Sequence, residues 1–243
     1  MLGYVDLHSH WVAAIDDGVK SAGEGVELLR RLHAVGFSTV VATPHMRPGM
    51  FNNDRAALEA AYAETLQHFP ADRAGLPVVH LSSEHFFDDV VFGRIVGGQS
   101  LPYPGGKSIL VEFSPQAFPA FLQHRLFDVR RAGFHVVIAH PERYQPVWKD
   151  VGCLEPFLDA GAHLLLDVAA LVGKYGRASQ RAAEELLDEE AYEAACSDAH
   201  RPADVDDVAR GIERLRQRVG DAGVVALLRD GPGRILAPPA RLR

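Results

Sequence analysis

The sequence predicts an α/β protein whose parallel strands form a closed or nearly closed barrel within one domain, residues 1–243. Short β-rich runs alternate with helical patterns along the whole chain, and seven such runs can be recognised. The runs are apolar throughout, which is typical of parallel strands covered by helices on both faces. No composition shift, repeat or low-complexity tract divides the chain. Because closure leaves no signature in a single sequence, a doubly wound open sheet is the alternative architecture.

The expected strands and helices follow one another from the N-terminus. The strands are the runs GYVDLH, FSTVVAT, LPVVHLSS, SILVEF, FHVVIAH, AHLLLDVA and YEAACSD, at residues 3–8, 37–43, 76–83, 108–113, 134–140, 162–169 and 192–198. Helices are expected at residues 22–36, 54–69, 118–133, 153–161, 178–188 and 203–220. Gly36 is a suitable stop for the first helix, and Asn53 or Asp54 a suitable N-cap for the second. The C-terminal APPARLR is expected to be a frayed surface end.

Composition limits the classes of function. A chain of 243 residues with 47% hydrophobic residues can bury a substantial core. It contains no apolar stretch approaching the roughly 20 residues of a membrane-spanning helix and no secretory leader pattern, so we expect a cytoplasmic protein that is not an integral membrane protein. Its two cysteines fit a reducing compartment. The formal net charge of -7 argues against nucleic-acid binding, although bound cations could still attract a phosphorylated substrate.

Metal-capable side chains follow six of the seven expected strands at their C-terminal ends. They are His8, His10, Asp16 and Asp17, then His45, then Glu84 and His85, then Glu112, then His140, and finally Asp198 and His200. In β/α barrels the loops at that edge converge on one cavity. Imidazole and carboxylate groups without thiolates suit manganese, iron or zinc, and more than four ligands indicate more than one ion. His85 fits either a ligand or a structural role.

These segments resemble the PHP superfamily, named for polymerase and histidinol phosphatase domains, and within it the bacterial capsule-type (CpsB/CapC-like) protein-tyrosine phosphatases. DLHSH and IDDG match the first motif, ATPHMRPGMF the second, SSEH and LVEF the two glutamate motifs, AHPERY the fifth and SDAH the last. The match runs in the family's order from Asp6 to about His200. The resemblance implies a distorted barrel of seven β/α units that holds three divalent ions, commonly manganese or iron, with zinc as a further option.

The resemblance also implies which residues hold each ion. The ligands of the first ion would be His8, His10, Glu84 and Asp198. Those of the second would be Glu84, Glu112 and His140, and those of the third Asp17, His45 and His200. Asp17 is preferred to Asp16 because it adjoins the glycine, as in the family motif.

Arginines complete the expected site. Arg143 matches the catalytic arginine of the family. A second phosphate-binding arginine normally lies in a longer loop after the last histidine, and here the chain continues directly as HRPAD, so Arg201 is the substitute that we consider. Arg47 is a further candidate near the mouth. Phe51 and Phe86 could pack against an aromatic substrate ring, or could equally be loop anchors.

The expected reaction is hydrolysis of a phosphomonoester by a metal-bridging hydroxide. Four carboxylates and three divalent ions give the site a net charge of about +2, which suits a phosphate dianion. A cysteine mechanism is not favoured, because neither Cys153 nor Cys196 is followed six residues later by arginine. The preferred substrate is protein phosphotyrosine, with a bacterial tyrosine kinase that controls polysaccharide export as a suggested partner. A histidinol-phosphate-type phosphatase, a PHP nuclease and an inactive metal-binding regulatory domain are the alternatives.

Overall fold

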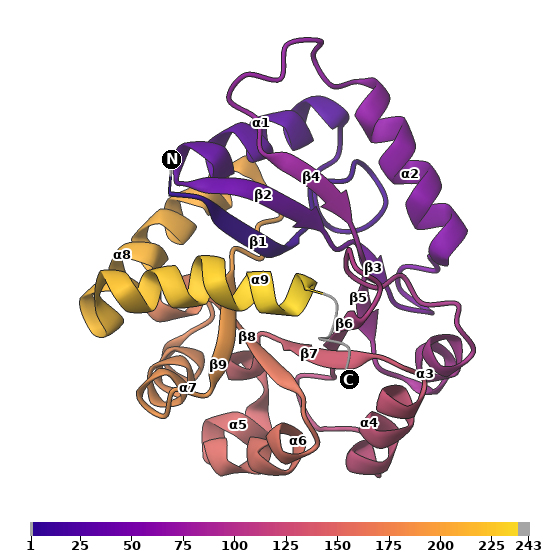
Figure 1. The fold of residues 1–243 in the computed structure, drawn as a ribbon, viewed down its shortest axis with the longest axis vertical. Helices are drawn as coiled ribbons and strands as arrows, with labels where there is room; N and C mark the ends of the chain where they lie inside the picture. Colours follow the sequence, from indigo (N-terminus) through magenta and orange to yellow (C-terminus); the bar gives the residue numbers. More distant parts are fainter. Residues whose placement is uncertain (1, 238–243) are drawn as a thin grey trace, which may run out of the picture.

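The strands of the computed structural model, which describes residues 2–237, pair in parallel within two sheets (Figure 1). One sheet has the order β1 (Tyr4–Ser9), β2 (Phe37–Ala42), β4 (Val78–Leu81). The other has the order β3 (His45–Met46), β5 (Glu84–Phe86), β6 (Ser108–Glu112), β7 (His135–Ala139), β8 (His163–Asp167), β9 (Tyr192–Cys196). The pairing within both sheets is parallel, as the sequence predicts for an α/β fold. Residues 238–243 of the expected frayed end lie outside the described residues.

Backbone contacts join the two sheets. Ser9 forms a parallel bridge with Ala199, which follows β9, and the amide of His10 donates to the carbonyl of Ala199 over 2.9 Å. On the far side of the first sheet, where β4 leads into β5 of the second, the amide of Glu84 lies 3.3 Å from the carbonyls of both Thr43 and Pro44. The C-terminal ends of strands from both sheets are therefore brought toward one another.

Strands β3 and β5 are not among the seven predicted strands. Pro44 has no amide proton for a ladder hydrogen bond, so β2 ends before it and the chain pairs again at His45, now with β5 of the second sheet. The predicted strand 76–83 is divided as well. β4 ends at Leu81, the hydroxyl of Ser83 donates to the carbonyl of Pro44 over 2.9 Å, and β5 begins at Glu84. A prediction based on apolar runs does not detect such short pairings at polar residues.

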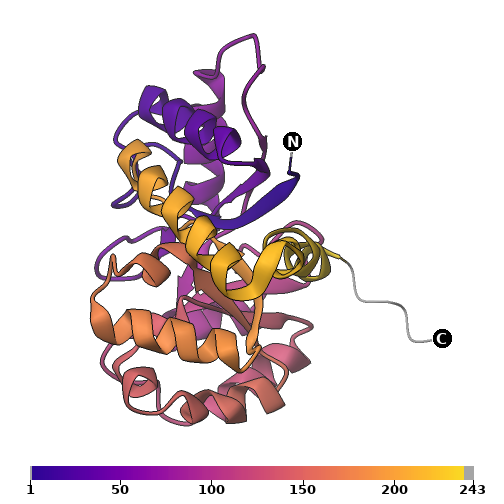
Figure 2. The same ribbon diagram turned by 90° about the vertical axis from the view of Figure 1, so that its left-hand side faces the viewer.

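The long helices cover the outer faces of the sheets. Their bounds are α1 Ala22–Ala34, α2 Arg55–Gln67, α3 Asp89–Val96, α4 Leu122–Arg131, α7 Arg177–Asp188 and α8 Val205–Val225. Shorter helices are α5 Gln145–Lys149, α6 Glu155–Asp159 and α9 Gly231–Leu236. Figure 2 shows α8 running between α1 and α7, where Arg214 pairs with Glu184 over 2.9 Å. None of the described helices is long and apolar enough to cross a membrane.

Several helix boundaries differ from the prediction for local reasons. Asp54, rather than Asn53, caps α2 by accepting the amide of Ala57 over 2.9 Å. The predicted helix 153–161 is reduced to α6, because residues 151–154 form a tighter 3₁₀ turn. The predicted helix 203–220 continues to Val225, although the backbone at Gly220 turns to a φ of 69°. Helices α3, α5 and α9 are not among the predicted elements.

Apart from β4, whose Val78 is exposed, the longer strands bury apolar side chains on both faces, as their composition predicts. One cluster lies between the strands and the outer helices. A second cluster lies on the inner face of the strands and is made of Leu7, Val41, Tyr103, Leu110, Val137, Ala139, Leu165, Ala194, Cys196 and Ile235. Ile235 belongs to α9, which packs across the strands (Figure 1), and its carbonyl accepts the hydroxyl of Ser108 over 2.9 Å. The inner face is therefore filled mainly with apolar side chains.

Candidate metal centre

All nine metal ligands expected from the sequence come together at the C-terminal ends of the strands. They form four overlapping groups, in each of which the possible ligand atoms lie within 4.8 Å of one another. The groups are His10, Asp17, His45 and His200; His8, His10 and Asp198; His8, Glu84 and His140; and His45, Glu84 and Glu112. Residues separated by almost two hundred positions are thus placed in one cluster.

Three members of the first expected ligand set lie close to one another, and the fourth, Glu84, approaches two of them. Nε2 of His8 lies 3.2 Å from Nε2 of His10 and 3.2 Å from Oδ1 of Asp198. Oε2 of Glu84 lies 3.3 Å from Nε2 of His8 and 3.6 Å from Nε2 of His10. Four ligands about 2.1 Å from a tetrahedral ion would be separated by about 3.4 Å. The spacing of His8, His10 and Asp198 therefore fits a divalent cation, whereas Glu84 is grouped with His8 and His140 and not with Asp198.

Glu84 links this set to its neighbours. Its Oε1 lies 3.0 Å from Nε2 of His140, and its Oε2 lies 3.0 Å from Nδ1 of His45. The set expected for the second ion is only partly reproduced, since Glu112 is grouped with His45 and Glu84 and not with His140. The position of Glu84 suits a carboxylate that bridges two ions.

The third set contains the most exposed member of the cluster. Oδ1 of Asp17 lies 3.4 Å from Nε2 of His45 and 3.5 Å from Nε2 of His200, and the Asp17 side chain is 54% exposed. Asp16 is buried instead. Its Oδ2 lies 2.8 Å from Nδ1 of His10 and accepts the amide of His45 over 3.1 Å. The structure thus places Asp17 between the imidazoles of His45 and His200, and places Asp16 behind His10, where it orients the ring.

The charges of the cluster favour cation binding. Burial alone would raise the pKa of Glu84, but His8 and His45 hold that pKa well below its usual value. Burial, together with the charge of Glu84, raises the pKa of Glu112 to about 7. Among the described residues, Glu112 Oε2 and Asp198 Oδ1 are buried without a hydrogen-bond partner. Buried acceptors of this kind are costly unless a cation or donor meets them, so the donor set fits divalent metal ions.

Two of the expected ligands adopt a left-handed backbone. The φ angles of His140 and Asp198 are 34° and 44°. The amide of Asp198 donates to the carbonyl of His8 over 2.9 Å, and the amide of the preceding Ser197 donates to Oδ1 of Asp6 over 2.9 Å. The buried Asp6 was not predicted as a site residue. It fixes the turn that carries Asp198, at the cost of a conformation that non-glycine residues rarely adopt.

The three arginines considered from the sequence lie at different distances from the cluster. A guanidinium nitrogen of Arg143 contacts Asp198 directly. Nη1 of Arg47 lies 3.6 Å from Oε2 of Glu112. Arg201 is exposed, and within the described part of the chain its guanidinium makes no hydrogen bond or ion pair with the cluster. Arg143 and Arg47 therefore contact residues of the cluster, and the described residues show no such contact for Arg201.

The aromatic residues considered for substrate packing line the same region. The ring of Phe51 stacks on the imidazole of His45, with centroids 5.2 Å apart and planes 5° apart. The guanidinium carbon of Arg47 lies 4.0 Å from the centroid of Phe86. Both rings thus contact site residues, one a candidate ligand and the other a candidate phosphate-binding arginine.

His85, considered as a metal ligand, and Cys196, considered as a nucleophile, are both engaged in structural hydrogen bonds. Nδ1 of His85 lies 2.8 Å from the carbonyl of Leu110, and its Nε2 accepts the amide of Leu101 over 3.2 Å, so both ring nitrogens are used within the core. Cys196 is buried, and its Sγ donates to the carbonyl of Leu166. Burial raises the pKa of Cys196 well above its usual value, which disfavours the thiolate that a cysteine nucleophile needs.

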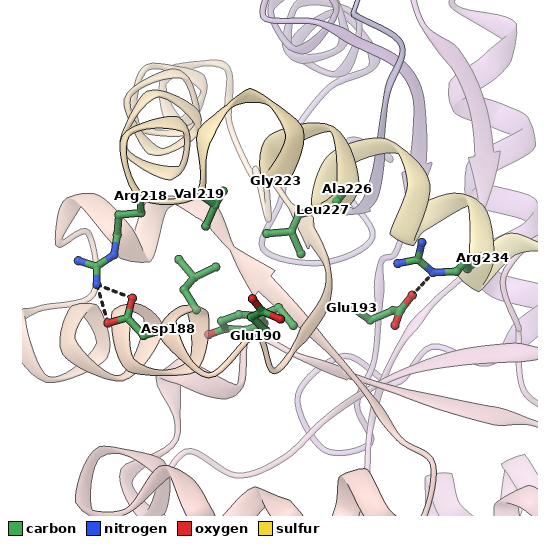
Figure 3. A pocket seen from close by; sticks show the side chains of 11 residues that line it. Asp188, Glu190, Glu193, Arg218, Val219, Gly223, Ala226, Leu227 and Arg234 are labelled. Atoms are coloured by element: carbon green, nitrogen blue, oxygen red, sulfur yellow. Dashed lines mark hydrogen bonds and ion pairs between the residues drawn. The ribbon is translucent and has the colours of Figure 1, made fainter.

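A separate cavity of about 500 Å³ lies near the beginning of β9 (Figure 3). Four of its five charged lining residues are already paired, since Arg218 donates to both carboxylate oxygens of Asp188 over 2.9 Å and Arg234 pairs with Glu193. None of the nine candidate metal ligands lines it. The cavity is therefore separate from the metal centre.

Comparisons with known proteins agree with this geometry. The family model for capsular polysaccharide synthesis, CpsB/CapC, matches residues 4–237. The putative tyrosine-protein phosphatase CapC of Staphylococcus aureus is 24% identical over 196 residues, which are 81% of this chain and 76% of the relative. The tyrosine-protein phosphatase YwqE of Bacillus subtilis (strain 168) is 26% identical, over 81% of this chain and 77% of the relative.

Solved structures show the same fold. A crystal structure from work on YwqE of Bacillus subtilis and CpsB of Streptococcus pneumoniae, described as metal-dependent tyrosine phosphatases, superposes with a TM-score of 0.85 at 23% identity. The superposition covers 96% of this chain and 94% of the other. An amidohydrolase from Mycoplasma synoviae superposes less closely, with a TM-score of 0.63 at 13% identity, over 100% of this chain and 89% of the other.

Proposed function

Because the chain belongs to the capsular polysaccharide synthesis family CpsB/CapC, we propose that it is a metal-dependent phosphatase that hydrolyses phosphotyrosine in proteins. The observation that carries this proposal is the convergence of nine histidine and carboxylate ligands beside Arg143. Relatives named as tyrosine-protein phosphatases support the choice of substrate.

We propose that the centre holds three divalent ions, manganese or iron, with zinc as an alternative. The first would be bound by His8, His10, Glu84 and Asp198, the second by Glu84, Glu112 and His140, and the third by Asp17, His45 and His200. Ions bound in this way supply an activated water near neutral pH and positive charge for the phosphoryl oxygens. The short distances within the first and third sets support the assignment.

The arginines of this chain would bind and orient the phosphate. Arg143 has one nitrogen at Asp198, and its side chain is 25% exposed, so its remaining donors can reach an oxygen of a bound phosphomonoester. Arg47 stands at the Glu112 side of the cluster and would contact a second oxygen. Both guanidinium groups would stabilise the charge that is rearranged as the ester bond breaks. In this arrangement Arg201 has no role in binding.

Two aromatic side chains support the choice of an aryl phosphate as the substrate. Phe51 and Phe86, fixed on His45 and Arg47, offer aromatic surface beside the centre against which a tyrosine ring could pack. We propose that the protein substrate is a bacterial tyrosine kinase that controls polysaccharide export.

We also propose that the two sheets together form a distorted barrel of seven β/α units, and that residues 1–243 are one domain. The bridge between Ser9 and Ala199, and the hydrogen bonds from Glu84 to Thr43 and Pro44, support continuity between the sheets. The cluster of inner apolar side chains supports a filled interior like that of other β/α barrels.

The test compares substrates and chelation. Protein loaded with manganese is expected to hydrolyse a phosphotyrosine peptide faster than a phosphoserine peptide or histidinol phosphate, and a chelator is expected to abolish the activity. The Cys196→Ser variant is expected to retain turnover and serves as the control for a cysteine mechanism. Faster turnover of histidinol phosphate would reject the substrate assignment, and activity that survives complete metal removal would reject the metal mechanism.

A further inference from the structure

The segment between β8 and α7 reaches the guanidinium of Arg143. Nη1 of Arg143 lies 3.6 Å from Oδ2 of Asp167, the last residue of β8, and its Cζ lies 4.5 Å from the ring centroid of Tyr175. Asp167 is fully buried, whereas Tyr175 is partly buried. The guanidinium therefore contacts carboxylates through one nitrogen and lies over the aromatic face of Tyr175.

The backbone of this segment is fixed by local hydrogen bonds. Oδ1 of Asp167 accepts the amide of Ala169 over 2.8 Å and begins a 3₁₀ turn over residues 168–172. Gly173 and Gly176, with φ angles of 80° and 90°, enclose Lys174 and Tyr175. The amide of Gly176 donates to the carbonyl of Gly173 over 3.0 Å, which closes the turn.

A side-chain contact links the same turn to the segment that carries His200. Nζ of Lys174 lies 2.9 Å from Oδ1 of Asp204. Oδ2 of Asp204 accepts the amide of His200, a candidate ligand, over 3.0 Å. Movement of the turn that carries Tyr175 would therefore disturb this contact, so Tyr175 is presented to Arg143 from a fixed support.

The arrangement leaves part of Arg143 available. Its hydrogen bond and ion pairs within the described residues all use Nη1, so Nε and Nη2 have no partner there. An aromatic ring over a guanidinium limits its rotation and attracts its charge, while leaving the in-plane donors open. Such a ring would lower the entropy that the arginine loses when it binds phosphate.

We propose that Tyr175 is a positioning residue, which holds the guanidinium of Arg143 in the orientation that binds the phosphate group of the substrate. The inference rests on the proposed phosphatase function. In it, Tyr175 acts only by orienting Arg143 and does not itself contact the substrate. It requires the aromatic ring and not the hydroxyl.

Phosphate binding and catalysis test this together. In manganese-loaded protein of verified metal content, the Tyr175→Leu variant is expected to bind inorganic phosphate about tenfold more weakly, as a desolvated cation–π contact of about 1.4 kcal/mol would imply. Its kcat/KM on p-nitrophenyl phosphate should fall by a similar factor. Tyr175→Phe retains the ring and should stay within about twofold of the wild type in both measurements.

A double-mutant cycle separates positioning from a general structural role. In an Arg143→Ala background, Tyr175→Leu is expected to have almost no further effect on phosphate affinity, because the contact is already lost. The matched control is Phe92→Leu, which removes a ring lying 5.2 Å from the guanidinium carbon of Arg125 on the outer helices. Phosphate affinity should be unchanged in that control.

The outcomes are distinguishable. Equal losses from Tyr175→Leu with and without Arg143, a Phe variant as weak as the Leu variant, or wild-type protein that binds no phosphate would each overturn the inference. Phosphate affinity that depends on Tyr175 through Arg143, in a protein that hydrolyses no phosphotyrosine peptide, would reject the proposed function while supporting the positioning role.

Discussion

The Nε2 atoms of His8 and His10 face each other at a distance of 3.2 Å in a buried site. An unprotonated imidazole nitrogen carries a lone pair, and two facing lone pairs repel unless a proton or a cation lies between them. Oxygens of Glu84 and Asp198 approach the same two nitrogens. The folded protein thus holds several lone-pair-bearing nitrogens and oxygens close together, and a bound metal ion would remove the repulsion between them.

Metal removal is therefore expected to destabilise the fold as well as to stop turnover. Metal at a hundred times its dissociation constant adds about 2.7 kcal/mol to the free energy of unfolding, or roughly 5–10 °C in Tm for a chain of this size. Differential scanning calorimetry of chelated and manganese-loaded protein measures the shift. His10→Ala should show a smaller shift, and equal Tm values with and without bound metal would contradict the interpretation.

Asp16 and Asp17 should behave differently despite being adjacent. Asp16→Asn weakens the acceptor that orients His10 and is expected to reduce metal affinity by about 10- to 100-fold without removing a ligand. Asp17→Asn removes the carboxylate that faces His45 and His200, so the number of ions bound at saturation should fall. Elemental analysis across a metal titration distinguishes the two. Equal losses of ions at saturation would refute the separate roles.

The candidate ligands could be predicted from the sequence because each follows an apolar run. An apolar run indicates a strand, and parallel strands bring their C-terminal ends to one edge, so His8, His140 and Asp198 could be placed together without knowledge of the packing. The choice of Asp17 over Asp16 came instead from the resemblance to the family motif, and Asp17 lies near His45.

The supporting residues could not be predicted because their partners are distant in the sequence. Asp6 acts on Ser197, 191 positions away, and Tyr175 acts on Arg143 through a turn fixed by two glycines. The short strands β3 and β5 escaped prediction for a related reason, since each is defined by its neighbour and not by an apolar run of its own.

The arginines should rank by their distance from the cluster. Arg143→Ala is expected to lower kcat about a hundredfold, because removing one hydrogen-bond donor that stabilises the charge of a transition state has an effect of about this size. Arg47→Ala should lower kcat/KM by about tenfold, because its guanidinium lies near Glu112 but does not contact it closely. Steady-state kinetics on a phosphotyrosine peptide measures both values.

Arg201→Ala provides the comparison for these two variants. Its side chain is exposed, and the described residues hold it only through its backbone amide, which donates to Asp204 over 2.9 Å. We expect kcat/KM within about twofold of the wild type. A loss as large as that of Arg47→Ala would restore Arg201 as the second phosphate-binding arginine suggested by the sequence.

His85 should make stability depend on pH in a defined range. Burial lowers the pKa of His85 to about 4, against an ordinary value of 6.5. Between these values the unfolded chain binds a proton that the folded chain does not, so the free energy of unfolding falls as pH falls from 6.5 to 4. A depression of roughly 2.5 pH units corresponds to about 3 kcal/mol, which is lost in full only below pH 4.

His85→Gln isolates this contribution. A glutamine amide can donate to the carbonyl of Leu110 and accept from the amide of Leu101, as the neutral imidazole does, but it binds no proton in this range. Urea denaturation of both proteins at equal metal content, from pH 7 to pH 4, should therefore show a steeper loss of stability in the wild type. Because the other titrating groups are common to both proteins, parallel pH profiles would mean that His85 takes up its proton over the same pH range in the folded and unfolded states, and that its Nε2 does not serve as the buried acceptor.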